Sequence, residues 1–224
     1  MRKHLNSRPI VVALAVIAAL LPSTPLWATP ILDQSFDAVA AGSSGGLNIQ
    51  SDQQVAQTFT VGISGKLAGL GLQVRTSNAS PPTGDLLVDI RPTTSGVPVE
   101  DDALAFANVT IPAADVPIFS PITDEFVSVD LSPFSIFVTP SDVLAIVLRY
   151  FDSGSYVWLD QIEDLGDTYA NGAGYARRFS PTWGRLQPES DFGFQTTVVP
   201  EPTTLALLSL GLAGLGFTRR KMKA

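Results

Sequence analysis

The sequence predicts an all-β body with antiparallel strands, folded as a sandwich or a barrel. Short runs of β-branched and aromatic residues alternate with polar residues at the two-residue period of a strand. The chain contains 18 Gly and 17 Pro residues, and clusters of these with Ser and Thr separate the runs. Between its two ends, the chain has no long segment with the 3.6-residue period of a helix.

The expected strands, in chain order, are Ile31–Phe36, Gln54–Val61, Lys66–Arg75, Asp85–Arg91, Ala103–Ile111, Glu125–Leu131, Phe134–Val138, Val143–Tyr150, Tyr156–Ile162, Tyr175–Phe179 and Asp191–Val199. Val143–Tyr150 is the most apolar of them, so we expect it at the centre of a sheet. Gly69 marks an expected β-bulge, because the alternation slips beside it. Ala38–Asn48 is small and Gly-rich and is expected to be a loop, and Gly62–Lys66 is expected to be a hairpin turn.

The N-terminus has the pattern of a secretory signal peptide. Arg2, Lys3 and Arg8 form a basic segment, Ile10–Leu21 is apolar, and Pro22–Ala28 is broken by Pro and ends in a small residue. We therefore expect residues 1–28 to be removed after export. A retained N-terminal anchor is the alternative.

The C-terminus has three parts in a fixed order. Pro200, Glu201 and Pro202 disfavour helix and present an extended backbone. The apolar run Leu205–Phe217 follows, and a helix over these 13 residues reaches about 20 Å, against about 30 Å for a bilayer core. The chain then ends in a basic group, which is expected to stay cytoplasmic and to stop transfer across the membrane. This group comprises Arg219, Arg220, Lys221 and Lys223.

A turn triplet, a short apolar segment and a basic end resemble the PEP-CTERM sorting tail of exported bacterial proteins. The resemblance implies handling by the secretion machinery and then by an exosortase, a membrane protease-transpeptidase, in bacteria that make extracellular polysaccharide. It implies tethering to the membrane through residues 200–224 before processing, and a place in the cell envelope, at the outer surface or in the extracellular matrix. An ordinary short membrane anchor is the alternative. The exported body is then residues 29–199.

The charge of the body excludes some functions. Seven of the 14 bases and one of the 21 acids lie in the terminal segments, so the body holds 20 acids and 7 bases, a net charge of −13. Such a surface disfavours nucleic acid, whose affinity comes from Lys and Arg on phosphate. The chain has no Cys, and its single His, His4, lies in the predicted signal peptide. Most zinc sites, thiol nucleophiles and His-based triads are therefore excluded from the mature protein.

Several motifs of the body follow one another in a familiar order. Gln57-Thr58-Phe59-Thr60 comes first, then Thr139 to Leu148, then Tyr156 with Trp158, and Asp191 to Thr196 closes the series. This order resembles the jelly-roll modules of bacterial exported proteins, which are related in shape to carbohydrate-binding modules. The resemblance implies an antiparallel jelly-roll sandwich for residues 29–199, but a fold by itself does not fix a function.

One aromatic window is a candidate glycan site. All four Tyr and both Trp of the body lie between residues 150 and 183. Flat rings with a polar edge suit stacking on sugars. The candidate contacts are Tyr156, Trp158, Tyr175 and Trp183. Tyr156 and Trp158 share one face of an alternating strand, so ordinary core packing is the alternative for both.

The same window carries acids that are weak candidates for Ca²⁺. Asp160, Asp164 and Asp167, with Glu163, offer oxygen ligands but lack the spacing of an EF-hand loop. A solvated acidic loop is the alternative, and we expect no other cofactor.

These observations predict a non-enzymatic exported protein of the cell surface or extracellular matrix, associated with exopolysaccharide. A carbohydrate-binding module is the alternative. A glycoside hydrolase is a weaker alternative, because it needs two carboxylates that face each other across a cleft.

Overall fold

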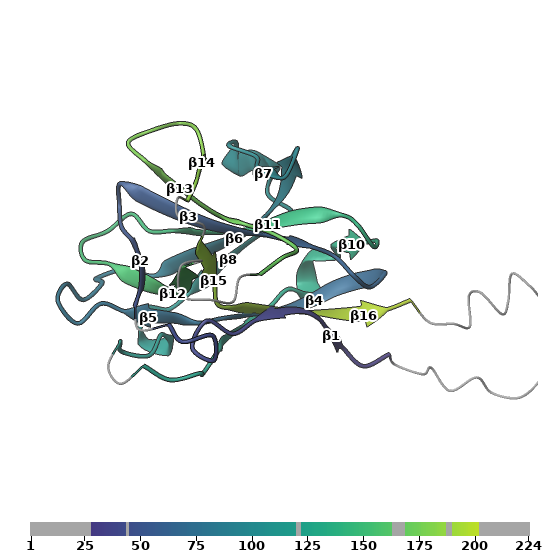
Figure 1. Cartoon of the computed structure of the whole chain (residues 1–224), viewed down its shortest axis with the longest axis horizontal. Helices are drawn as coiled ribbons and strands as arrows, with labels where there is room; N and C mark the ends of the chain where they lie inside the picture. The colour runs from purple at the N-terminus through teal and green to yellow at the C-terminus, as the bar shows by residue number, and fades with distance from the viewer. Residues whose placement is uncertain (1–27, 44, 120–121, 163–168, 187–189, 202–224) are drawn as a thin grey trace, which may run out of the picture. The chain divides into compact units, whose positions relative to one another are not determined.

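Antiparallel strands make up nearly all of the regular structure in the computed structural model of the chain, which confirms the all-β expectation. The structure describes residues 28–201, except 44, 120–121, 163–168 and 187–189. Thr29–Glu201 is one compact unit (Figure 1). The predicted signal peptide lies outside the described residues except for Ala28, and so do Pro202, the apolar run and the basic end. The jelly-roll topology stays a prediction.

The first sheet has β16 at its centre. Its strands are β1 (Ile31–Phe36), β16 (Phe194–Pro200), β4 (Gly65–Leu72), β9 (Val127–Asp130) and β10 (Phe137–Val138). β16 pairs with β1 on one side and with β4 on the other, and β9 and β10 both pair with the far edge of β4. Thr197 lies opposite Gly69 and Val198 opposite Leu67. This register shift confirms the bulge that was expected at Gly69.

The second sheet is the largest, and β11 lies at its centre. Its strands are β14 (Gly184–Arg185), β13 (Gly174–Arg178), β3 (Gln53–Thr60), β11 (Val143–Arg149), β6 (Leu86–Thr94), β7 (Val97–Pro98) and β8 (Ala107–Ile111). β11 pairs with β3 from Val143 to Leu148 and with β6 from Leu144 to Arg149, and it is buried on both faces, as the apolar run predicted.

The third sheet is built around β12 and closes one end of the body. Its strands are β15 (Ser190–Phe192), β12 (Tyr156–Ile162), β2 (Gly46–Ile49) and β5 (Val74–Thr76). Leu159 donates its backbone N–H to Gln73 at 2.9 Å and accepts one from Gly193 at 2.9 Å. Gln73 and Gly193 separate β4 from β5 and β15 from β16, so these bonds join the third sheet to the first.

Aromatic side chains fill the space between the sheets. One core cluster contains residues from all three sheets, and the largest aromatic side chains that are completely buried in it are Trp158, Tyr150, Tyr156, Phe59, Phe192 and Phe194. The ring of Trp158 stacks on that of Phe192, with centroids 4.7 Å apart, and its Nε1 donates to the carbonyl of Gly193 at 2.9 Å. The shared core holds the first sheet, and with it β16, against the large sheet.

Three local expectations are wrong. Gly62–Lys66 is no hairpin turn, because β3 and β4 belong to different sheets and the chain crosses between them here. The expected loop Ala38–Asn48 contains most of β2, which pairs with β12. A strand was expected from Ala103, but the 3-10 helix η1 (Asp102–Leu104) forms first and β8 begins at Ala107. The other 3-10 helices are η2 (Ala113–Asp115) and η3 (Ser132–Phe134).

Candidate functional site

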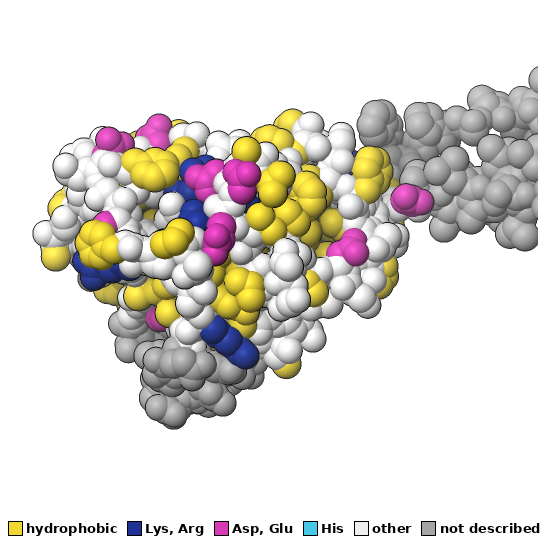
Figure 2. All heavy atoms as spheres, turned by 90° about the horizontal axis from the view of Figure 1, so that it is seen from above, with side chains coloured by type: hydrophobic (Ala, Val, Ile, Leu, Met, Phe, Trp, Pro, Cys, Tyr) yellow, Lys and Arg dark blue, Asp and Glu magenta, His cyan; other side chains and the backbone are white. Residues whose placement is uncertain are grey.

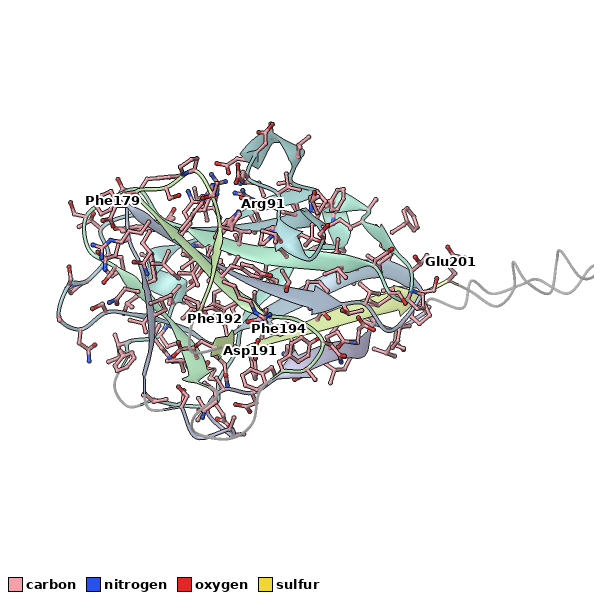
Figure 3. The ribbon with its side chains drawn as sticks, turned by 45° about the horizontal axis from the view of Figure 1, so that its top comes forward. Arg91, Phe179, Asp191, Phe192, Phe194 and Glu201 are labelled. Atoms are coloured by element: carbon pink, nitrogen blue, oxygen red, sulfur yellow. The ribbon has the colours of Figure 1, made fainter. Side chains whose placement is uncertain are left out.

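The predicted sorting triplet begins inside the sheet. On β16, Val198 lies opposite Leu67, Val199 opposite Lys66 and Pro200 opposite Gly65. Val198 is completely buried, whereas Glu201 is exposed and follows the last paired residue directly. Figure 3 labels Glu201 at one tip of the body. No flexible linker therefore separates the folded body from the triplet.

Both chain ends leave the body at this same tip. Ile31, the first residue of β1, lies opposite Val198 in an antiparallel pair, so β1 begins beside the point where β16 ends. Only Thr29 and Pro30 separate the predicted cleavage site from β1. The two predicted targeting segments are thus attached to neighbouring strands of one sheet.

Tyr156 and Trp158 are core residues and are not available to a ligand from solvent. Both are completely buried. The hydroxyl of Tyr156 donates to the carbonyl of Gly84 at 2.6 Å, and burial raises the pKa of Tyr156. The interpretation of these two rings as glycan contacts is therefore wrong in this structure, and the alternative of core packing holds for both.

Tyr175 and Trp183 lie elsewhere, on the outer face of the large sheet. They pack with Ala56, Ala145 and Val147 in a second small cluster, and each is only 8% exposed. The guanidinium carbon of Arg177 lies 4.7 Å from the centroid of the Trp183 ring. The ring is therefore almost completely covered, and a sugar cannot stack on it.

Five charged side chains beside Trp183 form a network, which we call the outer-face charge cluster. They are Asp89, Arg91, Asp102, Arg149 and Arg177. Figure 2 shows basic and acidic side chains gathered on the upper face of the body. Asp89 and Arg91 are completely buried. They occupy alternate positions of β6, on the face opposite Val88 and Ile90.

Each carboxylate of this cluster is held by more than one arginine. Arg149 Nε lies 2.8 Å from Asp89 Oδ2, and Arg91 Nε donates to the same oxygen at 3.1 Å. Asp102 contacts Arg91 at 2.6 Å and Arg149 at 2.8 Å. Its third partner is Arg177 at 3.3 Å, and burial lowers the pKa of Arg177. Both carboxylates are thus neutralised by structural ion pairs, an arrangement that does not suit the acid and base of a hydrolase.

Sequence reasoning missed this cluster. The signal that could have found it is Asp89-x-Arg91 on a strand otherwise buried on both faces, because a buried charge requires a partner. Arg149 ends the neighbouring strand, opposite Leu87. The cluster therefore follows from pairing β11 with β6, which local pattern alone does not provide.

A shallow groove of about 280 Å³ lies on the same outer face. Its polar lining includes Thr58, Thr60, Asn171, Tyr175 and Arg185. The Thr60 hydroxyl donates to the carbonyl of Asn171 at 2.9 Å, which ties the floor of the groove to its wall. Hydroxyl and guanidinium groups around an open groove can hydrogen-bond to a polar ligand.

The structure describes only one of the three calcium candidates. Asp160 accepts a hydrogen bond from the Ser190 hydroxyl at 2.7 Å, and burial raises the pKa of Asp160. Asp164 and Asp167 lie outside the described residues. Within residues 28–201, apart from the four gaps, no three His, Cys, Asp or Glu side chains gather closely enough to hold a metal ion.

Residues 198–221 match the family described as the PEP-CTERM protein-sorting motif. The chain therefore carries the sorting signal of an exported protein that an exosortase handles, as the resemblance implied. The match begins at Val198, so the motif and strand β16 overlap.

A solved structure similar to this chain is that of the clostridial cysteine protease Cwp84 after propeptide cleavage. The two are 15% identical with a TM-score of 0.47, and the match covers 70% of this chain and 38% of that one. This chain thus spans well under half of that protein. No match to a curated protein was found. Among the residues that the structure describes, no helix is long and apolar enough to span a bilayer.

Proposed function

We propose that the protein is a non-enzymatic component of the bacterial cell surface or extracellular matrix, associated with exopolysaccharide. The observation that carries this proposal is the overlap of the sorting motif with β16. Because Val198, Val199 and Pro200 are paired in the sheet, the sorting motif begins within the folded body. The tail is the sorting signal, and the disulfide-free β body is the part that is exposed at the cell surface.

The outer-face charge cluster supports a non-enzymatic role. Asp102 pairs with Arg177, which lies over the Trp183 ring, and arginines neutralise both Asp89 and Asp102. A general acid needs a proton to give and a general base needs a free lone pair. Asp89 and Asp102 meet neither requirement, because three guanidinium groups surround the two carboxylates.

Cell fractionation tests the sorting role. Full-length protein and a variant that ends at Glu201 are expressed in a host with an exosortase and in the same host without it. Full-length protein is expected in the envelope or matrix of the first host and as an unprocessed membrane form in the second, and the truncated variant is expected in the medium. Thr204→Ala is the matched control and should behave like the full chain. Identical distributions of all forms in both hosts would overturn the proposal.

Direct carbohydrate binding is the second candidate, and the outer-face groove favours it. Tyr175 lines the groove and lies opposite Arg185 across β13 and β14. The host's own polysaccharide is the probe, with retention on an affinity gel as the readout.

Tyr175→Ala should reduce that retention at least fivefold. Phe179→Ala should leave it unchanged, because Phe179 is an exposed aromatic residue just past β13 that does not line the groove. Equal retention of both variants and the parent, with all three folded, would remove the groove as the binding site.

A further inference from the structure

Exposed apolar side chains gather at the tip where the chain leaves the body. Phe106, Phe134 and Phe137 line a cavity of about 420 Å³, and all three are exposed, Phe137 at 70%. Ile31 and Leu32, at the start of β1, are exposed as well. We call these five residues the apolar tip.

The register of the first sheet fixes the place of the apolar tip relative to the tail. Phe137 lies opposite Lys66 on β4, and Lys66 lies opposite Val199 on β16. Neighbouring strands are about 4.8 Å apart, so the backbone of Phe137 is about 10 Å from that of Val199. On the other side of β16, Ile31 lies opposite Val198. Exposed apolar side chains therefore flank the exit of the tail on both sides.

The length of chain beyond the body keeps the apolar tip close to whatever holds the tail. The apolar run begins at Leu205, four residues after Glu201. Four extended residues span at most about 14 Å. When the run lies in a bilayer, the tip is thus confined to within about 14 Å of the hydrocarbon, the depth at which aromatic side chains are enriched.

We propose that the apolar tip docks on the surface of a zwitterionic lipid bilayer while the tail is inserted. The proposal rests on the proposed function, because it requires the tail to enter a membrane. Asp33, Asp142 and Glu201 lie at this tip with Lys66, so its local charge is negative and does not suit an anionic lipid surface. Docking fixes the orientation of the outer-face groove and the outer-face charge cluster relative to the membrane.

The experiment uses single cysteines in the full chain, which has none of its own. Phe137→Cys reports on the apolar tip, and Ser209→Cys reports on the apolar run. Phe179→Cys is the matched control, because Phe179 is 83% exposed and lies at the opposite end of the body from Glu201 (Figure 3). Each variant carries an environment-sensitive fluorophore and is reconstituted into phosphatidylcholine vesicles that contain lipids with a nitroxide at the headgroup or, in a parallel set, on the acyl chain.

The expected result is quenching of the probe at position 137 by headgroup nitroxides at least threefold stronger than that at 179, with a blue shift of its emission. If acyl-chain nitroxides quench the probe at position 209 but the probe at position 137 behaves like the one at position 179, the docking proposal is wrong and insertion of the tail is supported. If 209 is not quenched, the tail is not inserted, and both the docking and the membrane step of the proposed function are overturned. A blue shift at 137 without lipid quenching overturns docking and indicates that protein covers the tip.

Discussion

Val198 on β16 lies opposite Leu67 on β4, and both side chains are completely buried although Val198 is also the first residue of the sorting motif. Val198 thus belongs both to the hydrophobic core and to the sorting motif. The pairing continues to Pro200, so a protease that requires an extended, unpaired backbone meets the chain only from Glu201 onward.

Val198→Ala should lower the free energy of unfolding of the full chain by about 2 kcal/mol, because it removes two buried methyl groups and leaves a cavity. Val199→Ala is the control one residue away, where the side chain is only half-buried, and it should cost less than about 1 kcal/mol. Urea unfolding in detergent micelles measures both. Equal costs would mean that this end of β16 is not anchored in the core.

Gly46→Ala should destabilise the protein by about 1–3 kcal/mol. A Cβ at Gly46 would lie 2.2 Å from the carbonyl oxygen of Trp158, so β2 and β12 would have to separate. Gly45→Ala is the matched control, because a Cβ there meets nothing within 4 Å. Thermal unfolding of the two variants compares them, and the prediction fails if Gly46→Ala unfolds at the temperature of Gly45→Ala.

Asp89→Asn should cost about 3–5 kcal/mol, because it removes the completely buried carboxylate that Arg91 and Arg149 share and leaves only the partly exposed Asp102 to pair with both. Asp52→Asn breaks an ion pair with the exposed Arg178 and should cost about 1 kcal/mol or less. Denaturant unfolding at low and high salt separates the two, since only the exposed pair is sensitive to screening. A cost below about 1 kcal/mol for Asp89→Asn would contradict the structural role of the cluster.

Replacement of Asp160 by Asn and replacement of Asp130 by Asn should change the stability at pH 7 in opposite directions. Burial raises the pKa of Asp160 above 3.8, so the folded state holds this proton more tightly than the unfolded state. The stability that Asp160 contributes is present below the unfolded pKa and is lost as the pH rises through the folded pKa. Asp160→Asn should therefore raise the free energy of unfolding at pH 7 and converge with the parent at pH 3.

Asp130 is the control of opposite sign. The side-chain and backbone hydrogen bonds from Ser132 lower the pKa of Asp130, so its contribution is present above the unfolded pKa and is lost as the pH falls through the folded pKa. Asp130→Asn should lower stability at pH 7. Unfolding curves between pH 3 and pH 7 measure both, and a loss of stability at pH 7 in Asp160→Asn would contradict the desolvation argument.

Alternation and apolarity predicted most strands because burial decides those patterns. Val143–Tyr150 was expected at a sheet centre from its composition, and β11 lies there. β2 was missed because Gly46 carries no side chain to show a pattern, and the reason for that glycine is the approach of β12, which is distant in the sequence. Gly62–Lys66 has the composition of a hairpin turn, and the same composition permits a crossing between sheets.

The site was less predictable than the fold. The sequence around Trp158 and Trp183 does not distinguish the two residues. Trp158 fills the core, whereas Trp183 packs on the outer face of the large sheet beneath Arg177. That difference depends on tertiary structure: Trp158 lies on β12 in the core, whereas Trp183 lies in the loop between β13 and β14. The tail was recognisable because its three parts act locally and in order, whereas the outer-face charge cluster exists only once β6 and β11 are paired.

The most direct test of the account is the intact mass of the protein recovered from the host's envelope fraction. The account predicts a polypeptide that begins close to Thr29, ends at or beyond Glu201 and has lost the basic terminus. Full-length polypeptide recovered from the cytosol, with Met1 and Ala224 both present, would contradict it.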